Sequence, residues 1–257
     1  MRSFQYRLFR RLIFLVGRAH ALDHAPYFSF SDTDKKIDYN EVMLEAMPKL
    51  SVGDVMLHRD DGYASNVGIG GAMIHAGIYV GDSQLVEATQ HGVLHRHACH
   101  LLHSDRACIV RPRFSNEAIA ALAIKNAVKW AKKIVDFEYD ALFDFNGAEE
   151  REIVAALPKE EAKKDVRFCC TEIPYFCYLE HVEALRLYRR RNITLFTRLL
   201  GLWGLHPGEK IIDADMYVTG NFDLVWCSKL FTPEWAEKMG CSEEYVSKIM
   251  SWWKGKR

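Results

Sequence analysis

The segment 167–178 places two neighbouring cysteines, Cys169 and Cys170, just before a proline and several apolar residues. Proline is tolerated in the first turn of a helix, where its missing N–H would have no partner, so Pro174 predicts that a helix begins here. The two thiols would then lie at the helix N-terminus, where backbone N–H groups and the helix dipole favour thiolate over thiol. A cysteine in this position, with a histidine elsewhere to act as base, is the basic arrangement of a nucleophilic thiol.

A candidate base lies on a predicted strand over residues 73–80. Apolar residues alternate there with His75 and Gly77, so the histidine is on the face opposite the apolar side chains. A three-residue hairpin loop after this strand would place Glu87 opposite Gly77 and diagonal to His75, within reach of a long side chain. Glu87 would then orient one imidazole nitrogen while the other faces Cys170, as in a catalytic triad. A one-residue change in loop length would move Glu87 to the other face.

Other patterns predict the elements that must position these residues. Further strands are expected at 53–57, 84–88, 92–98 and 107–113, and further helices at 39–47, 117–134, from the cysteines to about residue 190, and from 232 to 253. Ser115 or Asn116 would cap the helix over 117–134. Its inward face would be formed by Ile119, Leu122, Val128 and Ala131. Strands gathered in the middle of the chain and flanked by helices favour an α+β fold, with the charged residues 146–166 as a surface insertion.

Composition excludes several classes of protein. The chain has 257 residues, of which 49% are apolar and 26% are charged, as in ordinary globular proteins. Thirty-four basic residues balance thirty-four acidic ones, which argues against bulk binding of nucleic acid. The seven cysteines follow no regular framework, so a reducing compartment is favoured over a disulfide scaffold. No run of about 18 apolar residues is present, so no membrane-spanning helix is expected.

The first residues allow two interpretations. Arg18 cuts the apolar run at 12–16 short of the length that a signal peptide needs. On a helical wheel, residues 2–18 form a basic amphipathic helix, which would either lie on an anionic membrane surface or pack on the domain. A cytoplasmic or peripherally membrane-associated protein is therefore favoured over a secreted one.

Several short motifs occur in a characteristic order between Leu50 and Leu179. They are Gly53-Asp54-Val55, His75-Ala76-Gly77-Ile78-Tyr79-Val80-Gly81, Val86-Glu87-Ala88, Gly92-Val93, Tyr139-Asp140 and Cys170-Thr171-Glu172. In this order and spacing the chain resembles the circularly permuted papain-like hydrolases of the YiiX type, relatives of the NlpC-type cell-wall peptidases and of lecithin:retinol acyltransferase. The resemblance implies a permuted papain-like (NlpC-type) fold, in which a central antiparallel sheet packs against the nucleophile helix.

The resemblance also implies roles for particular residues. Cys170 would be the nucleophile rather than Cys169, because it directly precedes the Thr-Glu pair, with His75 as base and Glu87 as the third, polar member. Tyr139, Asp140 and Thr171 would lie on the substrate side, although Tyr139 and Asp140 are equally consistent with the end of a helix. The substrate would be a peptide amide or a lipid acyl group, with no cofactor and no metal.

We expect the chain to divide into three parts. Residues 1–49 would form an N-terminal helix and linker, residues 50–230 the catalytic domain, and residues 231–257 a C-terminal helical extension. The last 80 or so residues carry no motif of the family.

A second interpretation, of a different class, is a non-catalytic domain that uses the same fold for binding. Six potential metal ligands occur within thirteen residues, namely His91, His95, His97, Cys99, His100 and His103. Their spacing fits no common zinc site, so a polar sheet edge is the simpler interpretation. Arg186 and the run 189–191 are interpreted as a solvated helix end rather than a phosphate site.

Overall fold

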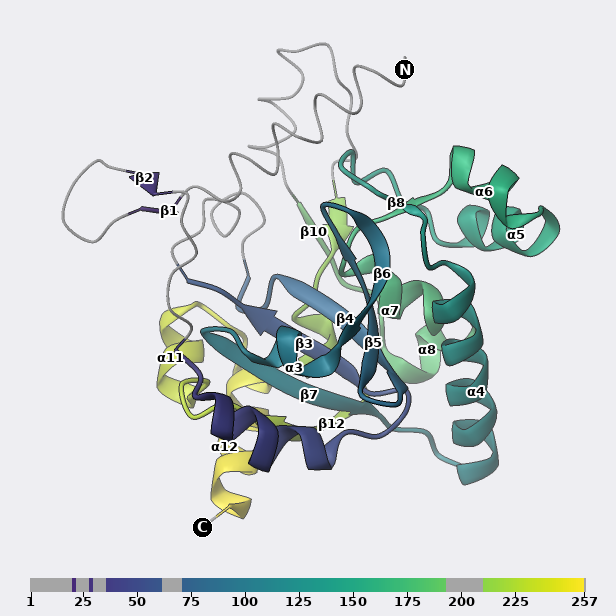
Figure 1. Cartoon of the computed structure of the whole chain (residues 1–257). Helices are drawn as coiled ribbons and strands as arrows, with labels where there is room; N and C mark the ends of the chain where they lie inside the picture. The colour runs from purple at the N-terminus through teal and green to yellow at the C-terminus, as the bar shows by residue number, and fades with distance from the viewer. Residues whose placement is uncertain (1–19, 22–27, 30–35, 62–70, 193–209, 257) are drawn as a thin grey trace.

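The computed structural model describes residues 20–21, 28–29, 36–61, 71–192 and 210–256, so the predicted amphipathic helix at 2–18 lies outside the described residues. A six-stranded antiparallel sheet forms the centre of the molecule, with strand order β12–β7–β3–β4–β5–β6 (Figure 1). Its strands are β3 (Val55–Arg59), β4 (His75–Gly81), β5 (Gln84–Thr89), β6 (Gly92–His97), β7 (Arg106–Pro112) and β12 (Phe222–Cys227). The chain thus has the expected α+β architecture.

Three pairs of two-residue or three-residue strands and several short helical segments complete the fold. The small strands are β1 (His20–Ala21), β2 (Phe28–Ser29), β8 (Glu138–Tyr139), β9 (Arg167–Phe168), β10 (Arg190–Asn192) and β11 (Lys210–Ile212). The helical segments η1 (Glu41–Ala46) and η2 (Met47–Lys49) occupy the position of the first predicted helix. No helix among the described residues is long and apolar enough to cross a membrane.

The hairpin between β4 and β5 has the predicted register, with Glu87 opposite Gly77. Asp82 and Ser83 form a tight turn with positive φ angles of 52° and 57°. The pairing shifts by one residue between Tyr79 and Gly81, so a two-residue turn and a bulge together give the register expected from a three-residue loop. Glu87 therefore faces the same side of the sheet as His75.

Two hydrophobic cores lie on opposite faces of the sheet. On one face, Ala76 and Ile78 share a core with Ile173 and Phe176 of α7 (Glu172–Cys177). On the other face, strand residues such as Leu85 pack with helix α3 (Ala98–Leu102) and η1. Strand alternation assigns His75 and Glu87 to the α3 face.

Helix α4 (Glu117–Lys133) begins at Asn116, whose side chain accepts hydrogen bonds from the N–H groups of residues 118 and 119, as predicted. The predicted inward face is correct at Ala131, which is buried, and at Val128, which packs partly buried on the core, but wrong at Ile119 and Leu122, which are exposed. The buried face consists of Ala123, Ala127 and Ala131. Small side chains let the helix approach the core closely, so the larger apolar residues at its start remain in solvent.

The cysteine segment does not continue as one helix to residue 190. It forms three short pieces, α7, η3 (Leu179–His181) and α8 (Val182–Leu185), and Arg186 ends the last of them in a left-handed conformation. The chain then enters β10. Six residues of α7 give only a small dipole, so the predicted dipole effect on the cysteines is correspondingly weak.

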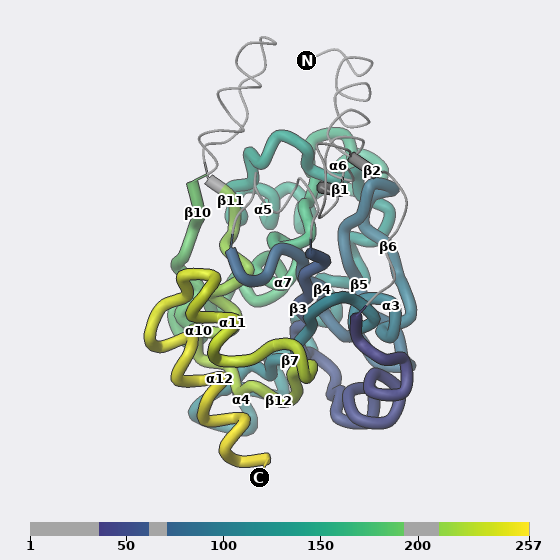
Figure 2. Tube along the Cα trace, turned by 90° about the vertical axis from the view of Figure 1, so that its left-hand side faces the viewer, coloured from purple at the N-terminus to yellow at the C-terminus, as the bar shows by residue number. Residues whose placement is uncertain are grey.

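The C-terminal residues belong to the same core as the sheet. Helix α12 (Glu243–Gly255) packs on β12, and α11 (Pro233–Lys238) packs on α12 (Figure 2); Tyr245 and Ile249 are buried in the core with α7. Helix α10 (Met216–Thr219) joins β11 to β12. The charged segment 146–166 forms a helical pair, α5 (Ala148–Ala156) and α6 (Lys159–Asp165), at the periphery of the fold (Figure 1).

Candidate active site

Cys170 lies in the turn that precedes α7 and is 7% exposed. Its Sγ is 3.7 Å from the backbone carbonyl oxygen of Ile74. Ile74 is the residue before His75, and α7 packs against β4. Local structure and packing thus bring the thiol to the first residues of the histidine strand.

His75 and Glu87 form a direct side-chain contact across the hairpin. Nε2 of His75 is 2.6 Å from Oε2 of Glu87, which leaves Nδ1 of the ring for another partner. The ring of His58, the cross-strand neighbour on β3, meets the ring of His75 edge to face with centroids 4.7 Å apart. The side chain of His75 is 19% exposed, whereas that of Glu87 is 3% exposed. The imidazole is therefore held on two sides and remains reachable from solvent.

Sγ of Cys170 makes no hydrogen bond to the imidazole of His75 in the structure, although both residues are described. Strand alternation directs His75 to the α3 face, while α7 covers the opposite face. The two side chains can meet only at the N-terminal end of β4, where the thiol contacts Ile74. The structure thus brings the thiol of Cys170 to the residue before His75 but does not pair it with the imidazole; catalytic hydrogen bonds are often long before substrate binds.

Cys169 has a different environment from its neighbour. It is 2% exposed and belongs to the main core, and its Sγ is 3.4 Å from the hydroxyl of Thr171. Burial raises the pKa of the Cys169 thiol well above its usual value, and the adjacent thiol of Cys170 adds to the rise. Cys169 is therefore a protonated core residue at neutral pH.

Two buried carboxyl groups lie beneath the cysteine turn. Glu172 accepts a hydrogen bond from the backbone N–H of Cys169 at 2.6 Å, and burial raises its pKa well above the usual value. Asp140 accepts hydrogen bonds from the N–H groups of Leu142 and Asp144, and burial followed by the charge of Asp144 raises its pKa to about 7. Both acids are thus biased toward the uncharged form.

The residues predicted on the substrate side are buried instead. Tyr139, Asp140 and Thr171 are 8%, 1% and 2% exposed. Tyr139 pairs with Phe168 in the small parallel sheet β8–β9, and the carbonyl of Thr171 accepts a hydrogen bond from Tyr217. They support the cysteine turn rather than form a substrate surface. Nor do Tyr139 and Asp140 end a helix, because α4 stops at residue 133.

Arg96 is a functional candidate that sequence reasoning missed. Its Nη1 is 3.1 Å from Oε1 of Glu87, the oxygen that His75 does not use. In β6, Arg96 pairs with Leu85, two residues from Glu87 and on the same face. Extending the predicted hairpin register by one strand would have revealed this neighbour.

The C-terminal part of the chain joins both sides of the site. The carboxylate of Asp215 accepts hydrogen bonds from the N–H groups of Ala72 and Met73, just before the histidine strand. Tyr217, two residues later, holds the carbonyl of Thr171 at 2.8 Å. Nothing in the local sequence signals these contacts, because their partners are about 45 to 145 positions away in the chain.

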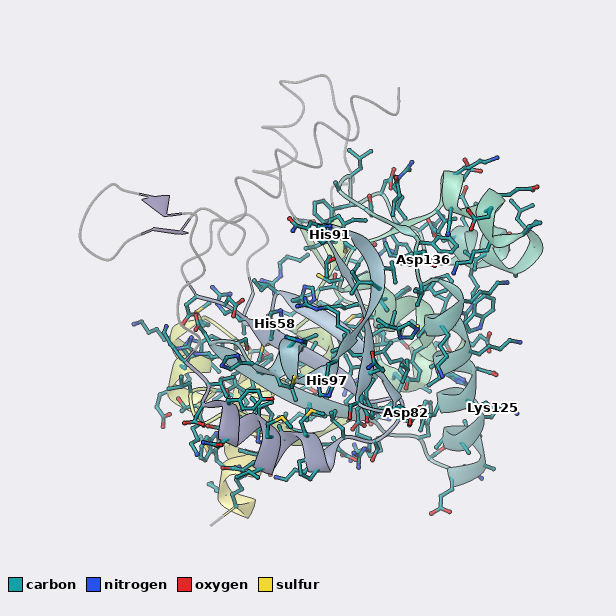
Figure 3. All side chains as sticks on the ribbon, in the orientation of Figure 1. His58, Asp82, His91, His97, Lys125 and Asp136 are labelled. Carbon is teal, nitrogen blue, oxygen red and sulfur yellow. The ribbon has the colours of Figure 1, made fainter. Side chains whose placement is uncertain are left out.

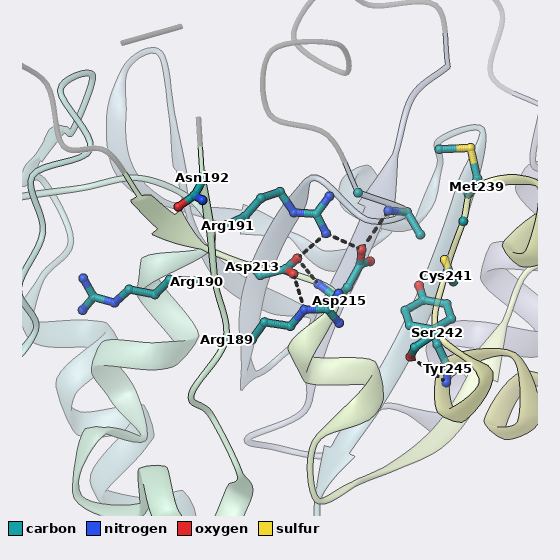
Figure 4. Close-up of a pocket in the computed structure, with 13 residues that line it drawn as sticks. Arg189, Arg190, Arg191, Asn192, Asp213, Asp215, Met239, Cys241, Ser242 and Tyr245 are labelled. Atoms are coloured by element: carbon teal, nitrogen blue, oxygen red, sulfur yellow. Dashed lines mark hydrogen bonds and ion pairs between the residues drawn. The ribbon is translucent and has the colours of Figure 1, made fainter. Parts of the chain in front are cut away.

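A pocket of about 330 Å³ lies beside this segment (Figure 4). Arg191 bridges Asp213 and Asp215 at 2.8 and 2.9 Å, and Arg189 contacts Asp213 at 2.9 Å. The basic run was expected at a solvated helix end, but it lies in and next to β10 within an ion-pair network. Asp215 also accepts hydrogen bonds from the backbone N–H groups just before β4. We therefore interpret this network as structural contacts that hold β10 and the segment after β11 to the start of β4.

The histidine-rich segment follows the edge strand β6 rather than surrounding one point. His91 lies at the β5–β6 turn, and His97 lies at the other end of the strand (Figure 3). Nδ1 of His97 caps α3 by accepting from the N–H of Cys99 and is 2.9 Å from its Sγ. Within the described part of the chain, no three His, Cys, Asp or Glu side chains are grouped to hold a metal ion.

Comparison with known proteins finds no matching family model, no matching curated protein and no matching solved structure. The site is therefore interpreted from its own geometry.

Proposed function

We propose that the protein is a cysteine hydrolase or acyltransferase with a permuted papain-like (NlpC-type) fold, acting through Cys170, His75 and Glu87. The observation that carries this proposal is the contact of 2.6 Å between Glu87 and His75 on a hairpin that ends beside the thiol of Cys170. A buried carboxylate that fixes one imidazole nitrogen leaves the other available for proton transfer. The order of the histidine strand before the cysteine turn is the one that the resemblance implies.

In this proposal Nδ1 of His75 takes the proton of Cys170 when substrate brings the two side chains together. The thiolate attacks the carbonyl carbon of an amide, ester or thioester, and the carbonyl electrons move to oxygen. Collapse of the tetrahedral intermediate breaks the bond to the leaving group, which receives the proton from His75. Water or another acceptor then cleaves the thioester. Peptide amides and lipid acyl groups are the proposed substrates.

Backbone N–H groups of the cysteine turn are the proposed oxyanion donors, but most are already used. The N–H of Cys169 donates to Glu172, and the N–H groups of residues 172 and 173 donate to the carbonyls of residues 169 and 170. The N–H of Cys170 or of Thr171 is therefore the candidate donor. Such a donor contributes about 10²-fold or more to the rate of acyl transfer.

The test compares wild-type protein with Cys170→Ala and Cys169→Ala on a panel of amides, esters and thioesters. We expect Cys170→Ala to lose at least about a thousandfold in rate, because no other thiol can take its place at the start of β4. Cys169→Ala serves as the matched control and should retain activity within a few fold. Equal rates for wild type and Cys170→Ala would reject the proposal.

A further inference from the structure

Arg96 stands at the outer end of a chain of contacts that leads to His75. It extends from the edge strand β6 on the face that carries Glu87 and His75. One carboxylate oxygen of Glu87 contacts Arg96 at 3.1 Å and the other contacts His75 at 2.6 Å. The carboxylate is therefore held between two nitrogen groups, one on each side.

The burial of Glu87 makes these partners necessary. Its side chain is 3% exposed, and a buried carboxyl without partners prefers its neutral form. Burial acts to raise the pKa of Glu87, but His75, Arg96 and His58 together outweigh it and hold that pKa below the usual value. Glu87 can accept a hydrogen bond from His75 with full strength only while it remains ionised.

We infer that Arg96 is a positioning residue that keeps Glu87 charged and aimed at His75, an inference that rests on the proposed function. Its ion-pair partner is Glu87, so we expect it to act on His75 through that carboxylate. Its own side chain is 43% exposed, so dissolved salt can screen its charge. The site is thus expected to respond to ionic strength through Arg96.

Other titratable groups near these residues must be separated from this effect. His58 faces His75 from β3, and the thiol of Cys170 contacts Ile74, just before β4. His100 and Cys99 on α3 lie close enough to Arg96 to feel its charge. If Arg96 acts through its contact with Glu87, replacing it should change the pKa of Glu87 specifically. A general change of charge on this face would shift the neighbouring groups as well.

The experiment follows the carboxyl carbon of Glu87 by NMR in protein that carries Cys170→Ala, so that no activity is needed. Its signal is assigned by its absence from Glu87→Gln. Arg96→Gln should raise the pKa of Glu87 by about one pH unit, and Arg96→Lys should restore at least half of that shift. Salt at about 1 M should raise the pKa of Glu87 more in protein that keeps Arg96 than in the Arg96→Gln protein. His95→Gln, a neighbouring exposed residue on the other face of β6, is the matched control.

Kinetics on the protein with an intact thiol complete the test. Arg96→Gln should lower kcat/KM about tenfold, with Arg96→Lys close to wild type. An unchanged Glu87 titration in Arg96→Gln, or a shift equal to that of His95→Gln, would overturn the inference. A shifted titration in a protein that hydrolyses nothing would uphold the positioning role and reject the proposed function instead.

Discussion

Buried carboxyl groups lie on both sides of the candidate site, and their environments differ. Glu87, on the α3 face, contacts His75 and Arg96, and these partners hold its pKa below the usual value despite its burial. Glu172 and Asp140, beneath the cysteine turn, accept hydrogen bonds from backbone N–H groups, and burial raises the pKa of each. The same chemical group is thus charged on one side and biased to be neutral on the other.

The difference shows that charged partners outweigh burial at Glu87, whereas burial dominates at Glu172 and Asp140. In the proposed mechanism, a charged acid beside His75 would stabilise the imidazolium that forms when His75 takes a proton. A charged acid beside Cys170 would oppose the thiolate. We therefore expect the neutral acids to act as scaffolding that does not repel the nucleophile, and the charged one to act on the base.

The largest effect is expected for Asp140, whose protonation should make the free energy of unfolding depend on pH. Its pKa rises from 3.8 to about 7 on folding, so the folded protein retains a proton that the unfolded chain loses. Stability from this group is present below about pH 4 and is lost as pH rises to about 7, by about 4 kcal/mol in all. The free energy of unfolding, measured with urea, should therefore fall by about 4 kcal/mol less in Asp140→Asn than in wild type between about pH 4 and pH 7.

The control for this experiment is Asp165→Asn, an exposed carboxylate at the end of α6. It should follow the wild-type slope. Glu87 contributes with the opposite sign, because its stabilisation is present above its unfolded pKa and is lost as pH falls through its lower folded pKa. An Asp140→Asn protein with the same pH slope as wild type would show that Asp140 is charged in the folded state, and the contrast would fail.

A smaller effect is expected on activity when each glutamate is replaced by its neutral isostere. Glu87→Gln removes a charge that orients His75, so kcat/KM should fall about a hundredfold, equivalent to about 2.7 kcal/mol. Glu172→Gln replaces an acid that is already neutral and keeps an acceptor for the N–H of Cys169, so its kcat/KM should stay within about threefold of wild type. Equal losses in the two variants would break the proposed division between charged and neutral acids.

How much the sequence could predict depends on the range of the interactions. The β4–β5 register was predicted because a short loop and alternating side chains define it locally, and the contact between His75 and Glu87 follows from it. The helix over 117–134 was located correctly by its cap at Asn116. Its buried face was predicted only in part, because Ile119 and Leu122 were assigned inward as large apolar residues, whereas alanines form the buried face here.

The remaining parts of the site depend on long-range contacts. Asp215 and Tyr217 reach the histidine strand and the cysteine turn from the far end of the chain, and no local pattern marks such partners. Tyr139 and Thr171 are buried because β8, β9 and α7 pack together, and short sequence motifs do not predict such packing. The short length of α7 likewise reflects the tertiary fold, since the sequence pattern alone favours a longer helix.

The central claim, that Cys170 is the reactive thiol, is tested most directly by sub-stoichiometric iodoacetamide near pH 6. At that pH the reagent selects thiolates, and Cys169 is protonated in the core. We predict that peptide mapping finds the first label on Cys170 among the seven cysteines, that Cys169→Ala leaves its rate unchanged, and that His75→Ala suppresses it. A first label on Cys169, or a uniform low reactivity with no preferred cysteine, would contradict the account.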